Sequence, residues 1–252
     1  MAVDSIPSLG VFRVGNVMSR AWRLFTGNIL FFAAVPFLSY VIVFVAAMAF
    51  MLVAAFAGFA SNVAAVTVVG VIVGVLLFMG LYMIGEAVVL LGAFQRLRGE
   101  PLRVGEALER AFARLFPLIG LSILWGLGIM IGMVLLIVPG LILLCIWAVV
   151  VPACIVERLG VTASMSRSAE LTAGYRWQIF GLLVLLGVIN WIGSLIIQLT
   201  LGLAGSTLAS IGSFIWLSGW TGYWNCVLIM TYHDLRVAKE GIDTEQIASI
   251  FD

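Results

Sequence analysis

Charged side chains are scarce in this sequence. Asp, Glu, Lys and Arg make up 10% of its 252 residues, and 63% of the residues are hydrophobic. Soluble domains average about 25% charged residues, and a soluble fold of this length cannot hide so much apolar surface. The composition therefore excludes a soluble globular protein, a disordered chain and a nucleic-acid binder, and it predicts a polytopic membrane protein.

Cysteine and histidine are also rare. The three cysteines, Cys145, Cys154 and Cys226, all lie in apolar runs, which argues against a disulfide framework. There is one histidine, and no Cys or His cluster has the spacing of a metal site. Motifs of soluble enzymes, such as a Walker loop, G-x-S-x-G or H-E-x-x-H, are absent. We therefore expect no catalytic residue, no metal and no cofactor.

Three long stretches carry no charge at all. They contain 62, 42 and 57 residues and lie between Arg23 and Glu86, Arg114 and Glu157, and Arg176 and Asp234. One helical crossing needs about 20 residues, so each stretch suits two crossings. We predict an all-α fold with six transmembrane helices in three hairpins: residues 29–57 and 63–95, 117–138 and 140–156, and 178–202 and 209–233. The predicted turns lie near Asn62, Pro139-Gly140 and residues 202–207.

The positive charges indicate the orientation. All 13 Lys and Arg residues lie outside the predicted hairpins, and the three turns are uncharged. Because cytoplasmic loops carry an excess of Lys and Arg, both termini are expected in the cytoplasm. Residues 1–10 have no basic stretch before an apolar run, so we expect no cleavable signal peptide. The whole chain, 1–252, is predicted to form one membrane domain with a cytoplasmic tail at 237–252.

A short charged segment precedes each hairpin, and the three segments align. They begin at Val14, Val104 and Val161, and each continues with Met or Leu four residues later, Arg after two more, and then a small residue. Such self-similarity indicates an internal repeat. We predict three repeats, at residues 11–98, 103–158 and 161–236, each consisting of an interfacial helix and a membrane hairpin.

The first two charged segments are amphipathic at helical spacing, and the third is shorter and more polar. A helix of this kind lies in the membrane interface with its apolar face down and its arginines near the headgroups. Each such arginine contributes about 1 kcal/mol with anionic lipid. The alternative is that these helices are plain connectors at the membrane surface. The candidates for headgroup contact are Arg13, Arg20, Arg23, Arg103, Arg110, Arg114 and Arg167.

Three polar residues within the apolar stretches are candidate intramembrane sites: Glu86, Asn190 and Asn225. A charge in the bilayer is costly and is a functional hypothesis by default. Glu86 precedes Arg96 by ten residues, about 15 Å along a helix, which places it mid-membrane if Arg96 marks the interface. Counting from Asn62 instead makes Glu86 interfacial. Asn225 stands at a comparable distance before Arg236, so it and Glu86 could face each other, either as a functional pair or as an interhelical hydrogen bond.

Several motifs resemble one bacterial family. They are Ile137-Val138-Pro139-Gly140, Val151-Pro152, Glu157-Arg158-Leu159-Gly160, Arg167-Ser168-Ala169-Glu170-Leu171-Thr172-Ala173-Gly174-Tyr175-Arg176-Trp177, and Tyr232-His233-Asp234-Leu235-Arg236-Val237-Ala238-Lys239-Glu240-Gly241. Together they resemble the membrane domain named after glycerophosphoryl diester phosphodiesterases, which also occurs as a stand-alone six-span protein. The resemblance implies a multi-pass protein of the bacterial inner membrane. The phosphodiesterase barrel of some relatives needs about 250 further residues and a polar catalytic cluster, so we do not expect its activity here.

These observations favour a non-enzymatic membrane protein that organises lipids or partner proteins through its helix bundle and basic interfacial helices. The alternative is a transporter or lipid-handling protein with a polar site around Glu86 and Asn225. The expected partners are membrane lipids, anionic ones included, together with a membrane-protein partner or a second copy of the chain. An intramembrane enzyme is the weakest reading, because the reactive groups are so few.

Overall fold

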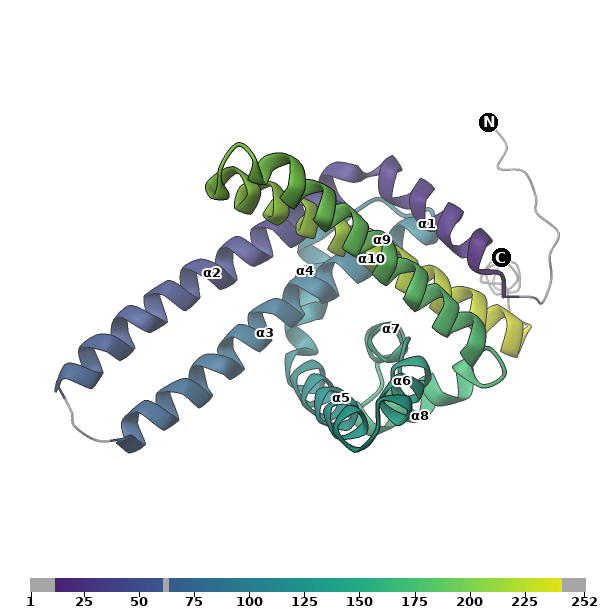
Figure 1. Cartoon of the computed structure of the whole chain (residues 1–252). Coiled ribbons are helices and arrows are strands. Elements are labelled where there is room, and N and C mark those ends of the chain that lie inside the picture. Colours follow the sequence, from purple (N-terminus) through teal and green to yellow (C-terminus); the bar gives the residue numbers. More distant parts are fainter. Residues whose placement is uncertain (1–11, 61–63, 242–252) are drawn as a thin grey trace.

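The protein is a bundle of α-helices joined by short turns (Figure 1). The computed structural model describes residues 12–60 and 64–241, and within these residues the regular structure is entirely helical. The predicted turn at Asn62, the first residue of the first predicted repeat and residues 242–252 of the tail lie outside the described residues. The helices are α1 Val14–Gly27, α2 Ile29–Ala60, α3 Ala64–Leu97, α4 Val104–Ala113, α5 Leu115–Leu135, α6 Ile137–Ile146, α7 Val150–Val156, α8 Val161–Thr172, α9 Arg176–Gly202 and α10 Ser206–Glu240.

The long helices pack in sequential pairs. Helices α2 and α3 lie side by side and project away from the remainder of the chain, while α9 and α10 cross it as a second pair (Figure 1). Helix α5 packs against α6 in the same manner, and α10 also contacts α1, α2 and α3. Helix α10, the last helix of the chain, therefore packs against the first three helices as well as against its neighbour α9.

Within residues 12–60 and 64–241, five segments are long and apolar enough to cross a membrane. They are Ile29–Val53, Ile72–Leu97, Leu115–Leu135, Ile137–Val156 and Arg176–Gly202. The structure thus agrees with the prediction of an all-α protein with membrane-spanning helices. Helix α10 has 35 residues, which is sufficient length, but its many Ser, Thr, Gly, Trp and Tyr residues lower its mean hydropathy.

The second predicted hairpin differs from the sequence prediction in two places. The chain turns at Leu136, whose backbone is extended, and not at Pro139-Gly140. Pro139 lies in the first turn of α6, where a missing N–H is tolerated. The predicted helix 140–156 is also interrupted between α6 and α7. Pro152 cannot donate a hydrogen bond to the carbonyl of Ala148 and would clash with it, so the helix breaks one turn before the proline.

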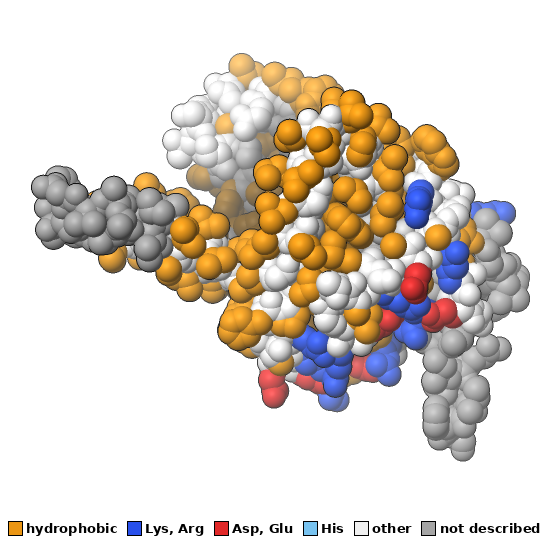
Figure 2. Space-filling view, turned by 90° about the horizontal axis from the view of Figure 1, so that it is seen from below, with side chains coloured by type: hydrophobic (Ala, Val, Ile, Leu, Met, Phe, Trp, Pro, Cys, Tyr) orange, Lys and Arg blue, Asp and Glu red, His pale blue; other side chains and the backbone are white. Residues whose placement is uncertain are grey.

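Buried residues concentrate at the end of the molecule that carries the charges. In the candidate span of α2 only 11% of the residues are buried, against 39% in that of α3. The buried residues of α3 belong mainly to its last third, from Ile84 to Gln95. Figure 2 shows the acidic and basic side chains gathered in one region of the visible face, beside a large hydrophobic surface. The hairpins are therefore packed at their bases and apolar on their exposed flanks.

Candidate functional site

Glu86 and Asn225 lie in direct contact, as their positions in the sequence suggested. The Asn225 Nδ2 atom donates a hydrogen bond of 2.7 Å to Glu86 Oε2, and the Tyr82 hydroxyl donates one of 2.8 Å to Glu86 Oε1. Asn225 Nδ2 also donates to the carbonyl of Thr221, at 2.9 Å. The pair joins α3 to α10, and both oxygens of the carboxylate are occupied by donors.

A second polar contact closes the space beside this pair. The hydroxyls of Tyr40 on α2 and Thr221 on α10 lie 2.7 Å apart, and the rings of Tyr40 and Tyr82 are stacked, with centroids separated by 6.1 Å. The cavity that these residues border with Glu86 has a volume of about 10 Å³. A water molecule needs about 10–15 Å³, so this space accepts about one water molecule and no larger solute.

Sequence reasoning missed the tyrosines and Thr221. Tyr82 precedes Glu86 by four residues, which places both on one helix face, and this spacing was a usable signal. Tyr40 and Thr221 had no such signal, because their meeting depends on how α2 and α10 pack. Glu86 lies near the midpoint of the candidate span Ile72–Leu97, and its depth in a membrane stays a prediction.

Asn190 does not join the other two candidates. Its Oδ1 atom accepts a hydrogen bond of 3.1 Å from the indole Nε1 of Trp216. The bond links α9 to α10 and fixes the orientation of the tryptophan. The three polar residues singled out in the sequence thus divide into one pair, Glu86 with Asn225, and one separate anchor for an aromatic ring.

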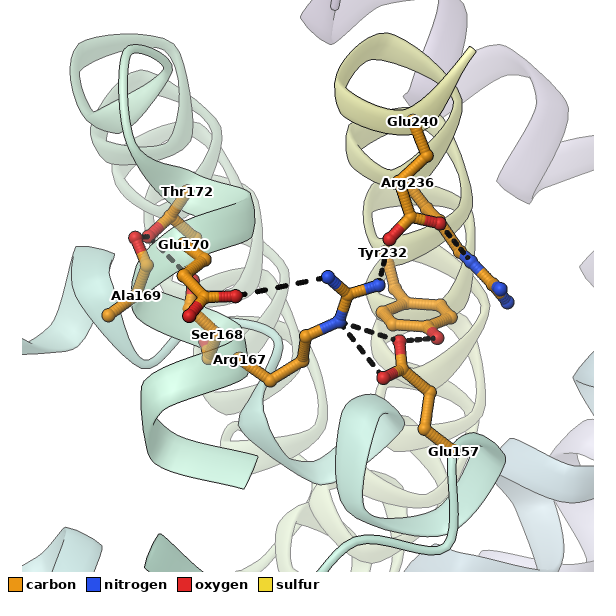
Figure 3. Close-up of polar contacts among 9 residues, drawn as sticks. All are labelled: Glu157, Arg167, Ser168, Ala169, Glu170, Thr172, Tyr232, Arg236 and Glu240. Atoms are coloured by element: carbon orange, nitrogen blue, oxygen red, sulfur yellow. Dashed lines mark hydrogen bonds and ion pairs between the residues drawn. The ribbon is translucent and has the colours of Figure 1, made fainter. Parts of the chain in front are cut away.

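Arg167 is the centre of an ion-pair network (Figure 3). Its Nε atom lies 2.9 Å from Glu157 Oε2, and its Nη2 atom contacts Glu240 at the end of α10. The Tyr232 hydroxyl donates to Glu157 at 2.6 Å, and Arg236 Nε donates to Glu240 at 2.8 Å. This arginine, predicted to meet lipid headgroups, instead holds carboxylates of the protein and ties α8 to the ends of α7 and α10.

The charges of this network reinforce one another. Burial alone would raise the pKa of Glu240, but the hydrogen bonds from Arg236 and Arg167 outweigh burial and hold that pKa below its ordinary value. Burial alone would lower the pKa of Arg167, whereas its bonds to Glu240 and Glu157 raise it above the ordinary value. The network therefore requires Glu240 in its ionised form.

The polar face of α8 has a further structural use. Ser168 Oγ donates to the carbonyl of Ile146 at 2.8 Å, and Thr172 Oγ1 lies 3.2 Å from the same oxygen. Ile146 is the last residue of α6, so the break before α7 leaves its carbonyl without a helical donor. Buried carbonyls need partners, and the two hydroxyls satisfy this one. This explains why the third charged segment is more polar than the other two.

The other candidate arginines differ in the exposure of their side chains and in their ion-pair partners. Arg20 forms an ion pair of 2.8 Å with Asp234, and Arg114 reaches the carbonyl of Leu159 at 3.4 Å. Arg103 and Arg110 are exposed and share Glu106 as a partner. Arg13 and Arg23 are exposed and make no side-chain contact of this kind within the described residues. Four of the seven candidates, Arg13, Arg23, Arg103 and Arg110, therefore remain accessible to a headgroup.

Helix α4 presents three distinct faces. Ala107 and Ala111 are buried against the protein, and the charged residues Glu106, Glu109 and Arg110 occupy the opposite side. Between these faces runs an exposed apolar stripe made of Val104, Leu108 and Phe112, which are 46%, 40% and 54% exposed. In α1 the equivalent of Phe112 is Trp22, which is 56% exposed.

Comparisons with known proteins leave the family open. No family model matches the chain, and no curated protein or solved structure matches it. Within residues 12–60 and 64–241, no group of three or more His, Cys, Asp or Glu side chains is arranged to hold a metal ion. The resemblance to the membrane domain of glycerophosphoryl diester phosphodiesterases therefore stays a prediction, and the chain is identified at this point as an all-helical protein with membrane-spanning helices.

Proposed function

We propose that the protein is a six-span membrane protein that binds anionic lipid at its cytoplasmic rim and has no enzymatic activity of its own. Helix α10 supplies the sixth span, because it packs against α9 along the hairpin that residues 203–205 close. The concentration of Lys and Arg at one end of the bundle supports a cytoplasmic location for that end and for both termini. In a bacterium this membrane is the inner membrane.

The repeat supports an interfacial position for α1 and α4. At the fourth position of the aligned segments stand Val17, Ala107 and Ser164, and all three are fully buried. At the eighth position stand Ala21, Ala111 and Ser168, of which the most exposed has 1% of its surface accessible. The three helices therefore turn the same side toward the protein. In α1 and α4 this leaves an aromatic side chain exposed at the ninth position, Trp22 and Phe112, beside the polar face.

The observation that carries the proposal is the three-faced surface of α4. A helix packed on the protein by one side needs an apolar medium on its second side and water on its third, and the membrane interface is where both are found. The exposed Arg103 and Arg110 then lie at the level of the headgroups. Each contributes about 1 kcal/mol toward an anionic lipid, so the protein selects and orders anionic lipid around its rim.

The transporter alternative has less support. A solute pathway needs a cavity that reaches the polar site, whereas the cavity beside Glu86 accepts about one water molecule. Both oxygens of Glu86 are engaged by Tyr82 and Asn225. This closed arrangement supports a role of the pair in holding α3 against α10.

Two cysteine positions on α4 test its place in the membrane. Phe112→Cys and Glu109→Cys, each labelled with a polarity-sensitive fluorophore, are compared in vesicles of phosphatidylglycerol and phosphatidylcholine. The native cysteines are buried, so labelling is confined to the new site. We expect lipid-borne quenchers to act on position 112 and aqueous iodide to act on position 109. Equal quenching of both positions by iodide would show that α4 stands in water and is a plain connector.

Lipid selection is tested with the double variant Arg103→Gln/Arg110→Gln. The variant should retain about 25-fold less phosphatidylglycerol than the wild type after purification from a mixed bilayer, since about 1 kcal/mol per arginine corresponds to about a fivefold change each and the two contributions add in free energy. Arg20→Gln is the control, because Arg20 is half-buried and its guanidinium is held by Asp234 at 2.8 Å. An unchanged lipid content in the double variant contradicts the proposed function.

A further inference from the structure

An aromatic groove lies between α1, α9 and α10. It has a volume of about 530 Å³ and is lined by Trp22, Phe25, Ile189, Ile215, Trp216, Gly219, Trp220 and Tyr223. None of these side chains is charged, and the Glu86 site does not share any of them. We refer to this surface as the aromatic groove.

The walls of the aromatic groove are ordered by contacts among its own residues. The rings of Trp216 and Trp220 stack at 5.9 Å, and Trp220 lies 5.7 Å from Tyr223. Trp22 closes the α1 end by an edge-to-face contact of 5.8 Å with Tyr223. Because Asn190 fixes the indole of Trp216, the groove is preformed and does not depend on a ligand for its shape.

The groove runs lengthwise along a membrane helix. From Tyr223 to Ile215 the chain descends eight residues of α10, or about 12 Å at 1.5 Å per residue. Tyr223 contacts Trp22 and Phe25 of α1, and Ile215 lies eight residues nearer to the turn between α9 and α10. Its direction is therefore that of a lipid chain descending from the headgroup level.

The residue that follows Trp22 in α1 carries a positive charge. Arg23 follows Trp22 directly, is exposed, and makes no ion pair or hydrogen bond through its side chain with the described residues. Arg20, three residues earlier in the same helix, is by contrast held by an ion pair with Asp234. Consecutive helix residues point about 100° apart, so Arg23 leaves α1 on the face next to that of Trp22. From there its guanidinium, which has no carboxylate partner within the described residues, is complementary to the phosphate of a lipid whose hydrocarbon chain lies in the groove.

We propose that the aromatic groove binds one acyl chain of an anionic phospholipid, whose phosphate is held by Arg23. This site deepens the lipid binding proposed above, because it depends on α1 lying at the level of the headgroups. It differs from the rim of α4 in holding an individual lipid by its chain. Indole rings suit this task because they combine a large apolar face with a polar edge.

Gly219 allows the groove to be filled without disturbing the bundle. A Cβ atom at Gly219 would meet nothing within 4 Å, so the side chain in Gly219→Leu extends into the groove. Gly187→Leu is the matched control, because Gly187 is an exposed glycine of α9 with the same open space and is not part of the groove. Both changes replace a helical glycine by a good helix former.

The experiment counts phospholipids held by the purified protein. Each variant is incorporated into phosphatidylglycerol nanodiscs, transferred to detergent, and analysed by native mass spectrometry. We expect the wild type and Gly187→Leu to retain a tightly held phosphatidylglycerol, and Gly219→Leu and Arg23→Gln to lower its occupancy by about tenfold. Ile215→Trp, which narrows the deeper end at a residue that is 60% exposed, provides a second blocking variant should Gly219→Leu fail to fold.

The outcomes separate the two proposals. Retention by the blocking variants equal to that of Gly187→Leu overturns the groove proposal. If Arg103→Gln/Arg110→Gln still loses phosphatidylglycerol in that case, lipid selection by α4 stands without the groove. Loss of the held lipid in nanodiscs of phosphatidylcholine but not of phosphatidylglycerol supports the role assigned to Arg23, while equal retention of both lipids overturns it.

Discussion

Replacing Glu86 by leucine should destabilise the protein by about 1 kcal/mol. The change removes the acceptor of two hydrogen bonds, from Asn225 Nδ2 at 2.7 Å and from the Tyr82 hydroxyl at 2.8 Å. Only the first of these joins two helices, and interhelical hydrogen bonds in membranes contribute about 0.6 kcal/mol on average and at most about 1.7. Asn225 is fully buried, so its amide finds no water in exchange.

Glu86→Gln should change the stability much less. Glutamine keeps one carbonyl oxygen as an acceptor, and its amide group can donate. The Asn225 Oδ1 atom, which is buried and has no partner within the described residues, is available to accept from that amide if the asparagine turns over. We therefore expect a change within about 0.5 kcal/mol, which distinguishes loss of hydrogen bonding from loss of charge.

Thermal melts in detergent provide the measurement. For a chain of this size about 1 kcal/mol corresponds to a Tm lower by about 2–4 °C. Thr200→Leu is the control, because Thr200 is exposed and bonds only to carbonyls of its own helix, so its Tm should not fall. A Leu variant that melts with the wild type would refute the reasoning and remove Glu86 from the candidate sites.

Three further predictions follow from individual contacts. Gly222→Ala should lower the free energy of unfolding by about 1–3 kcal/mol, because its Cβ would lie 1.8 Å from the carbonyl oxygen of Phe32, whereas Gly219→Ala meets nothing and should melt normally. Ser168→Ala combined with Thr172→Val should destabilise by about 1–3 kcal/mol in chemical denaturation, since the Ile146 carbonyl loses both donors; stability equal to that of the exposed control Ser166→Ala would contradict this role. The pKa of Glu240 is lowered in the folded protein, so its stabilising contribution is complete above the ordinary value of about 4.3 and is lost as the pH falls through the lowered pKa. Acid titrations of Glu240→Gln should therefore lack part of the acid-induced loss of stability seen in the wild type, and superimposable titrations would exclude this contribution.

The sequence by itself determined the class of the protein and the approximate limits of its long helices. The transfer of apolar side chains into a membrane is a nearly additive, local quantity, so it can be summed along the chain without knowledge of the fold. The predicted spans at 29–57, 178–202 and 209–233 accordingly fall within α2, α9 and α10. The contact between Glu86 and Asn225 was also foreseeable, because each stands at a similar distance from the charge that follows it.

Only the tertiary structure decided the break between α6 and α7, the partners of Arg167 and the aromatic groove. Each depends on how one helix is rotated and shifted against another, which composition and spacing do not specify. Arg167 has the same place in its repeat as Arg20 and Arg110, yet two of the carboxylates that pair with it come from the distant positions 157 and 240. Trp216, Trp220 and Tyr223 have ordinary helical spacing, and they line a groove only because α1 and α9 stop short of covering α10 there. Contacts between distant residues are set by close packing, so they become visible only once the helices are placed.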